Sequence, residues 1–227
     1  MKAISVVISS CSRLRLLKKS IASLQESLVS TCKLNYILVE DFVDEPERRK
    51  ESRDWLENNV DIFSKVVFLN TKAGFGKHFQ EAVKNVESDF FFRMEDDQIF
   101  RRKIFLDPLL DILYSDNSLA SISLRRPKDN RDCIRNLVIN DIEFQQTTFF
   151  SDSLGLFNTS LTKSLIDTCG WDSLLHEKKV MTPASVKLGL KKFILGKKNK
   201  FKSSSIHYKH EGINERQGSY FSHHLVS

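Results

Sequence analysis

Apolar and polar residues follow two alternating patterns in the first half of the chain. Short apolar runs rich in β-forming residues predict strands over residues 3–8, 36–39, 63–69 and 89–94. Between them, apolar residues recur at helical spacing and predict helices over residues 13–29, from 44 to about 59 and from 74 to about 86. Strands and helices that alternate in this way are typical of βαβ units on a parallel sheet.

Two of these helices carry signals for how they begin. Ser12 is predicted to be an N-cap, because a serine oxygen accepts a hydrogen bond from an otherwise unpaired N–H group of the first turn. Asp44 and Glu47, with Pro46 in the first turn, predict a capping box for the second helix.

The second half of the chain is less regular. Its patterns predict a short helix from Asp107, a strand over residues 119–124, irregular strands or a hairpin over 132–151, a helix over 159–168 that ends before Gly170, a further helix from Trp171 and a strand within 202–210. We expect the residues after 218 to be loose.

The composition is that of an ordinary globular protein, with 41% hydrophobic and 28% charged residues in a chain of 227. This length predicts one domain over residues 1–227. No apolar run approaches the roughly 20 residues of a membrane-spanning helix, and the N-terminal run is too short for a signal-peptide core, so we expect a cytoplasmic protein. The 4 cysteines form no CxxC pair, which favours reduced thiols over a zinc ribbon or a disulfide framework.

The net charge of +6 is concentrated in two stretches. Eight lysines and no acid lie from Lys187 to Lys209, and a second cluster consists of Arg125, Arg126, Lys128, Arg131 and Arg135. Each is either a solvated surface or a contact for a diphosphate, an acidic acceptor or an anionic membrane, which would bring the protein to the membrane periphery. Neither stretch interleaves aromatic residues in the manner of a nucleic-acid platform, so no nucleic-acid partner is expected.

Polar side chains follow three of the predicted strands where each strand ends: Ser9 and Ser10, then Glu40 and Asp41, then residues 95–97. In open α/β sheets, ligands bind outside the carboxyl ends of the strands. Consecutive carboxylates such as Glu95, Asp96 and Asp97 repel one another, so they imply either a bound cation or full exposure. Their position after a buried strand favours the cation, and hard oxygen ligands favour Mg²⁺ or Mn²⁺.

Three segments resemble the family 2-like glycosyltransferases of the GT-A fold: residues 6–13 (VVISSCSR), 39–41 (VED) and 94–97 (MEDD). The resemblance implies an α/β fold with a mixed, mostly parallel, Rossmann-like central sheet flanked by helices. It also implies a nucleotide-sugar-binding half over residues 1–100, an acceptor-binding half over 101–215 and a tail over 216–227.

Residue by residue, the same resemblance implies that Ser9, Ser10 and Arg13 meet the nucleotide sugar and that Asp41 receives the base. Asp96 is expected near the ribose and Asp97 as a direct metal ligand, with Glu95 beside it. Two positions depart from the family pattern. Cys11 stands where an aromatic residue often stacks on the base, and Glu95 replaces the commoner aspartate.

A glycine-bearing turn also resembles the family at residues 74–78 (GFGKH). Gly76 is expected to permit close approach of the backbone to the donor, and Lys77 to offset phosphate charge. A plain turn with an exposed lysine is an equal alternative.

Two later segments resemble the family's acceptor and metal segments. Glu177, and Asp172 as a second choice, are expected to deprotonate the acceptor hydroxyl, unless they are surface acids of a helix. His210 is expected to complete the metal shell, with a surface histidine as the alternative.

Together these features predict a metal-dependent glycosyltransferase that moves a sugar from a nucleotide-sugar donor to a hydroxyl of a glycan, lipid-linked or protein acceptor. The resemblance to family 2 implies that the transfer inverts the anomeric centre. Two other hypotheses stay open: a nucleotidyltransferase, and a non-catalytic nucleotide- or glycan-binding module with the same fold. The sequence predicts no oligomeric state.

Overall fold

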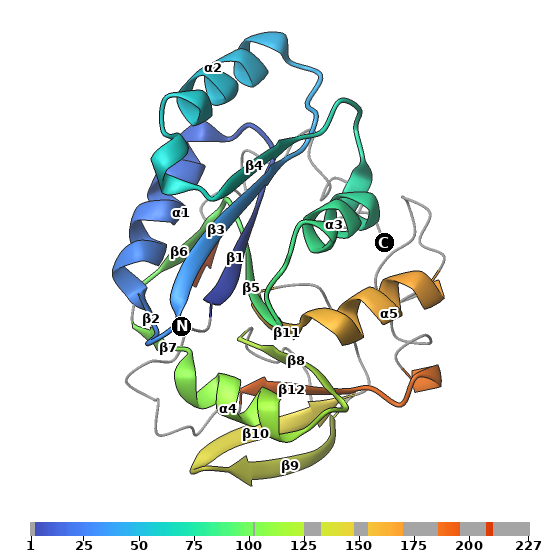
Figure 1. Cartoon of the computed structure of the whole chain (residues 1–227). Coiled ribbons are helices and arrows are strands. Elements are labelled where there is room, and N and C mark those ends of the chain that lie inside the picture. The colour runs from blue at the N-terminus through green and yellow to red at the C-terminus, as the bar shows by residue number, and fades with distance from the viewer. Residues whose placement is uncertain are drawn as a thin grey trace.

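The computed structural model describes residues 3–101, 103–124, 133–147, 154–169, 186–195 and 208–210. Within this part, strands form one large mixed sheet in the order β4-β3-β1-β5-β11-β8-β12-β10-β9 (Figure 1). Their bounds are Ala3–Ser10 (β1), Lys33–Glu40 (β3), Lys65–Phe68 (β4), Phe90–Glu95 (β5), Leu119–Ser123 (β8), Cys133–Ile139 (β9), Ile142–Thr147 (β10), Gly155–Asn158 (β11) and Lys191–Leu195 (β12).

The sheet has a parallel block and a mixed block. β4, β3, β1 and β5 are parallel neighbours, whereas β11 runs antiparallel to both β5 and β8. Beyond β8 the sheet continues through the parallel strand β12 to the antiparallel hairpin of β9 and β10. The predicted α/β class with a mixed, mostly parallel sheet is confirmed.

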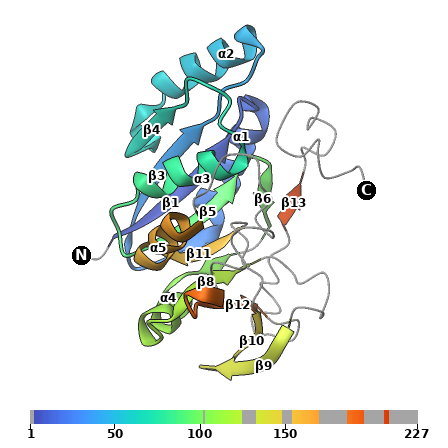
Figure 2. The same ribbon diagram turned by 90° about the vertical axis from the view of Figure 1, so that its right-hand side faces the viewer.

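Helices cover both faces of this sheet (Figures 1 and 2). Their bounds are Leu14–Ser27 (α1), Pro46–Glu57 (α2), Gly74–Lys84 (α3), Asp107–Ser115 (α4) and Thr159–Cys169 (α5). On one face α1, α2 and α4 share an apolar core with the sheet, in which Leu17 and Phe92 are fully buried. On the other face α3 and α5 enclose a second core, which contains Phe79 and Phe91.

Strand β5 lies in the middle of both cores. Successive side chains of a strand point to opposite faces, so Phe92 and Met94 enter the first core while Phe91 and Arg93 lie on the face of α3. A strand that is buried on both faces needs a nearly continuous apolar run, which is what this segment has. The same run carries Glu95, the last residue of β5, to the carboxyl edge of the sheet.

Two small sheets lie beside the large one. β2 (Leu28–Val29) pairs in parallel with β7 (Ile104–Phe105), and β6 (Gln98–Phe100) pairs antiparallel with β13 (Tyr208–His210). The second pairing brings a distant part of the chain next to the acidic turn after β5. No helix of the described residues is long and apolar enough to cross a membrane.

The predicted strands of the first half are confirmed to within a few residues, as are α1 to α5. The short strands β2, β6, β7, β11 and β12 were not predicted, because they form by pairing with strands distant in the sequence, which local periodicity does not indicate. Of the strand expected within residues 202–210, the described part of the chain contains the last three residues, which form β13. The helix from Trp171 and the residues after 218 lie outside the described part.

Both cap predictions were wrong. The N-cap of α1 is Arg13 rather than Ser12, and that of α2 is Glu45 rather than Asp44. Neither cap makes a side-chain hydrogen bond to its helix. For Ser12 the physical reason is its backbone conformation, because its positive φ of 55° is not that of an N-cap, which is usually extended.

We expect Gly155→Ala to destabilise the sheet, because an added Cβ would lie 2.5 Å from the carbonyl oxygen of Ile122 in β8. This neighbour is backbone and cannot move without disturbing the β11–β8 pairing. The free energy of unfolding, measured with urea, should fall by about 1–3 kcal/mol, as in other overpacked cores.

Ser121→Ala in β8 is the matched control. The buried Oγ of Ser121 has no hydrogen-bond partner in the described structure, so its removal breaks no hydrogen bond and should leave the free energy of unfolding unchanged or raise it. Equal losses in the two variants would contradict this account of Gly155.

Candidate functional site

The carboxyl ends of β1, β3 and β5 form one edge of the sheet. Ser9 pairs with Glu95, and Ser10 pairs with Glu40. Beyond the strands, the N–H of Asp41 donates to the carbonyl oxygen of Ser10 at 2.8 Å, which continues the pairing. The three polar strand ends that the sequence singled out are therefore adjacent in space.

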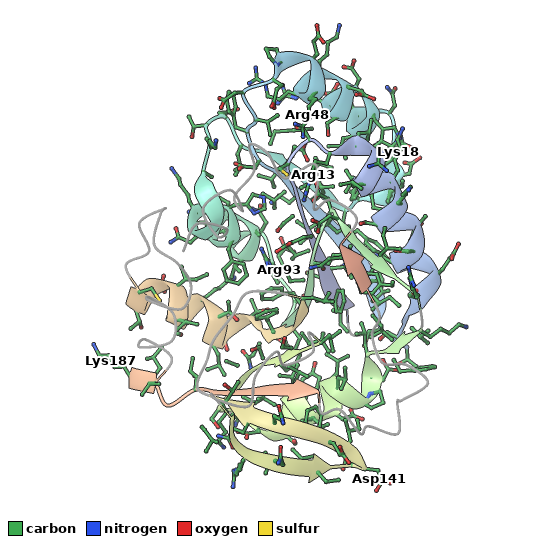
Figure 3. The ribbon with its side chains drawn as sticks, turned by 180° about the vertical axis from the view of Figure 1, so that it is seen from behind. Arg13, Lys18, Arg48, Arg93, Asp141 and Lys187 are labelled. Atoms are coloured by element: carbon green, nitrogen blue, oxygen red, sulfur yellow. The ribbon has the colours of Figure 1, made fainter. Side chains whose placement is uncertain are left out.

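Arg13, which is labelled in Figure 3, contacts both acids that follow β5, Asp96 and Asp97. Its Nη2 and Nε donate to the carboxylate of Asp96, with Nε 3.3 Å from Oδ2, and its Nη1 donates to Oδ2 of Asp97 at 3.3 Å. The side chains are 4%, 1% and 0% exposed for Arg13, Asp96 and Asp97. Burial opposes the positive charge, but the Asp96 carboxylate outweighs it and raises the pKa of Arg13 above its ordinary value. The guanidinium therefore stays charged.

Asp96 also organises the loop after β1. Its Oδ2 accepts hydrogen bonds from the Oγ of Ser10 and from the N–H of Cys11, both at 3.2 Å. Burial raises the pKa of Asp96, and the ion pair with Arg13 opposes that rise. Burial, with Asp96 next in importance, also raises the pKa of the Cys11 thiol, so this cysteine stays protonated.

Ser12 is held by a second buried acid. Its backbone has a positive φ of 55°, and its Oγ donates to Oε1 of Glu40 at 2.6 Å. Ser52 of α2 donates to the same oxygen at 2.9 Å. From the same helix, the guanidinium of Arg48 donates to the carbonyl oxygens of Ser12 and Cys11, each at 3.3 Å. The loop that carries Arg13 is thus tied to both β3 and α2.

Asp41 lies beside the start of α3. Its Oδ1 accepts a hydrogen bond from the N–H of Ala73 at 3.2 Å. The helix then begins at Gly74, whose φ of 68° favours glycine. Gly76 is buried and Lys77 is exposed, so the lysine is accessible at this end of the sheet.

A buried polar layer lies beneath this edge on the α3 face. His78 is 1% exposed, and its Nε2 lies 3.0 Å from the carbonyl oxygen of Val39. Burial, together with the nearby charge of Arg93, lowers the pKa of His78 to about 3, so the ring is neutral and Nε2–H donates. Arg93 in turn stacks on Phe79 and reaches Oγ of Ser9 at 3.3 Å. These contacts fix the start of α3 against the ends of β1 and β3.

Two of the three predicted metal ligands, Glu95 and Asp97, lie at the end of β5 and on the turn that follows it, and the third, His210, lies in β13. Glu95 is half-buried, Asp97 is buried, and the β6–β13 register places His210 opposite Gln98, the residue after Asp97. Only the backbone of His210 belongs to the described part. Among the described residues, no group of three or more His, Cys, Asp or Glu side chains is arranged to hold a metal ion. A Mg²⁺ or Mn²⁺ ion that is bound together with phosphates needs only one or two carboxylates, and the residues present fit that mode.

Some predicted residues are not described. Asp172 and Glu177 lie outside the described residues, as do all members of the arginine-rich second cluster except Arg135, and residues 196–207 of the lysine-rich stretch. Three residues that support the site were not predicted. Glu40 accepts the hydroxyl of Ser12, Arg48 donates to the backbone of the loop after β1, and His78 bonds to the end of β3. Glu40 was visible in the sequence as an acid at a strand end, and His78 lay in the glycine-bearing segment 74–78 without a role of its own, whereas nothing in the pattern of α2 indicated Arg48.

No protein-family model and no curated protein sequence matches this chain. Solved structures with a similar fold include S. aureus TarS 1–349, with 15% identity and a TM-score of 0.61 over 87% of this chain and 59% of that one. GalNAc-T7 in complex with UDP, GalNAc and Mn²⁺ has 12% identity and a TM-score of 0.62, over 86% and 42% of the two chains. The Pyrobaculum calidifontis mannosyltransferase PcManGT, in complex with GDP-Man and Mn²⁺, has 15% identity and a TM-score of 0.56, over 85% and 54%.

These similarities establish the fold. The chain has the GT-A glycosyltransferase fold, as its resemblance to the family predicted. It spans less than two thirds of the length of each of these three proteins.

Glu40→Gln tests the buried acid of this site. Burial raises the pKa of Glu40, so the folded chain holds this proton more tightly than the unfolded chain. Its contribution to stability is complete at low pH and is lost as the pH rises above 4.5 through the raised pKa. Glutamine keeps an acceptor oxygen for Ser12 and Ser52 but does not ionise. We therefore expect the stability of the variant relative to wild type to increase with pH, measured by urea unfolding over this range.

Glu47→Gln in α2 is the control for the same substitution at an exposed position. A stability difference for Glu40→Gln that does not change with pH would contradict the buried-acid explanation.

Proposed function

We propose that this chain is a nucleotide-sugar-dependent glycosyltransferase. The observation that carries the proposal is the convergence of Ser9 and Ser10, Asp41, and the acids after β5 at one edge of a GT-A sheet. Structural neighbours with this fold were solved with UDP-GlcNAc, with UDP, or with GDP-Man. Their bound nucleotides support a donor of the same class here.

The base of the donor would be received near Asp41. The family's usual aromatic is replaced by Cys11, which is 5% exposed, with its Sγ 3.9 Å from Asp96. The residue after Asp41 is Phe42, a half-buried aromatic whose ring lies 4.2 Å from the guanidinium carbon of Arg49. We propose that Phe42 provides the aromatic surface at this position, since an aromatic ring is suited to stacking on a base.

The diphosphate would lie over the turn after β5. Asp97 would hold a Mn²⁺ or Mg²⁺ ion, with Glu95 beside it and His210 from β13. When bound, such an ion supplies positive charge that stabilises the nucleoside diphosphate as it leaves. Lys77, exposed at the start of α3, adds a second positive charge on the same side.

The acceptor side of the proposal concerns residues outside the described part. Glu177, with Asp172 as the second choice, would take the proton of the attacking hydroxyl. A single displacement would invert the anomeric centre. The acceptor would be a hydroxyl of a glycan, a lipid-linked sugar or a protein, and the enzyme would act in the cytoplasm or at the periphery of a membrane.

The rival hypotheses differ in their products. A glycosyltransferase releases a nucleoside diphosphate, whereas a nucleotidyltransferase releases pyrophosphate. A binding module of the same fold binds a nucleotide or a glycan without turnover.

Binding of UDP, GDP, CMP and dTDP, with and without Mn²⁺, tests the donor site by thermal shift. One nucleotide is expected to stabilise the chain only when Mn²⁺ is present, by about 2.7 kcal/mol at a concentration about 100 times its Kd. The absence of a shift with any nucleotide, in a chain that melts cooperatively, would contradict the donor site.

Asp97→Asn tests the metal ligand. The amide is neutral and binds a hard cation more weakly, so transfer from the matching sugar nucleotide should fall about 100-fold or more, measured as release of the nucleoside diphosphate. Asp61→Asn, at an exposed position before β4, is the control and should stay active. Full activity of Asp97→Asn would refute the metal assignment, and release of pyrophosphate would favour the nucleotidyltransferase.

A further inference from the structure

Arg13 occupies the place where positive charge is needed. Its guanidinium contacts Asp96 and Asp97 together, and all three side chains are almost completely buried. A divalent ion at Asp97 would be a second cation beside the same carboxylate. Because like charges repel at short range in a poorly solvated site, the guanidinium and the ion oppose each other at Asp97.

Arg13 holds the two acids unequally. Asp96 receives Nη2 and Nε of Arg13, and also the Oγ of Ser10 and the N–H of Cys11. The contact of Arg13 with Asp97 is a single hydrogen bond of 3.3 Å from Nη1. The guanidinium can thus give up Asp97 at the cost of one bond while its attachment to Asp96 remains.

The backbone of the loop does not need to move in this exchange. The carbonyl oxygen of Arg13 accepts hydrogen bonds from the N–H groups of Leu16 and Leu17, each at 2.9 Å, at the start of α1. On the other side, Glu40 holds the hydroxyl of Ser12 and Arg48 holds its carbonyl oxygen. Only the far end of the Arg13 side chain has to shift.

We propose that Arg13 is a built-in counter-cation that covers Asp97 while the donor site is empty. A divalent ion alone then binds weakly, since it must displace Nη1 from Asp97. The diphosphate of a donor offers the guanidinium two anionic oxygens in place of Asp97, which suits the forked geometry of arginine. Ion and donor therefore bind as a coupled pair. This inference rests on the proposed function for its donor, but its metal step concerns the chain alone.

The test measures Mn²⁺ binding in the absence of any nucleotide. Binding is detected as a loss of the electron paramagnetic resonance signal of free Mn²⁺. Arg13→Met keeps a long side chain and removes the charge, so Mn²⁺ should bind about tenfold or more tightly than to wild type. Mn²⁺ should also raise the Tm of this variant more than that of wild type, because it replaces the missing counter-cation. Asp97→Asn in the Arg13→Met background should abolish the gain.

Arg15→Met is the matched control, since it removes the same charge from an exposed position two residues further along. Its Mn²⁺ affinity should stay within about twofold of wild type, because charges separated by solvent contribute little to the binding free energy of the ion. A change as large as that of Arg13→Met would overturn the proposal, because net charge alone would then explain both variants.

If Arg13→Met does not fold, Arg13→Lys tests the same proposal. Lysine keeps a charge but has no fork to hold both acids, so an intermediate gain in Mn²⁺ affinity is expected. An affinity equal to or weaker than that of wild type, in a folded variant, overturns the proposal.

The two hypotheses can fail separately. Tighter Mn²⁺ binding in the Arg13 variants, with no nucleotide bound by any chain, would support the counter-cation and overturn the donor site. A nucleotide shift that depends on Mn²⁺, with unchanged Mn²⁺ affinity in the Arg13 variants, would overturn the counter-cation and keep the proposed function.

Discussion

The arrangement of the site depends on one ion pair. Asp96 and Asp97 are adjacent carboxylates with 1% and 0% exposure, and two such charges are not stable in a buried turn without a cation beside them. Arg13 supplies that cation, and in doing so it joins the loop after β1 to the turn after β5. Asp96 then accepts the N–H of Cys11, and Ser20 of α1 places its Oγ 2.7 Å from the carbonyl oxygen of Asp96. The ion pair of Arg13 with Asp96 and Asp97 therefore both compensates the buried charges and fixes the geometry of the two loops.

The strands and helices that hold this ion pair could be predicted because local sequence patterns indicate them. Strand and helix periods differ, and the segments that form β1, β3, β5 and their helices are long enough to display them. The antiparallel strand β11, with residues 155–158, has four residues and takes its place through long-range pairing with β5 and β8. Strand β12 lies within a lysine-rich stretch whose most visible feature is charge. Both strands depend on partners distant in the sequence, which local periodicity does not indicate.

The sequence indicated which residues of the candidate site lie at the edge of the sheet, but not which side chains contact one another there. Parallel strands bring their carboxyl ends to one edge, so Ser9, Asp41 and Asp97 follow from strand order alone. Partner choice between side chains is a tertiary property. The Oγ of Ser12 was expected to accept an N–H of the helix that follows it. The positive φ of Ser12 instead departs from an N-cap conformation, and its hydroxyl donates to the buried Glu40, 28 residues away in the sequence.

The replacement of an aromatic by Cys11 is connected to the same ion pair. The Cys11 thiol is small enough to lie beside the Asp96 carboxylate, and the backbone N–H of Cys11 donates to Oδ2 of that carboxylate. Residues 10–13 of this loop are all buried. A bulky ring at this position would need room that Asp96 and Arg13 occupy, and overfilling a packed site is costly. Under the proposed function, a base would therefore be recognised beside Asp41 and not at the position of Cys11. Phe42, which follows Asp41 and stacks against Arg49, is an aromatic residue at that place.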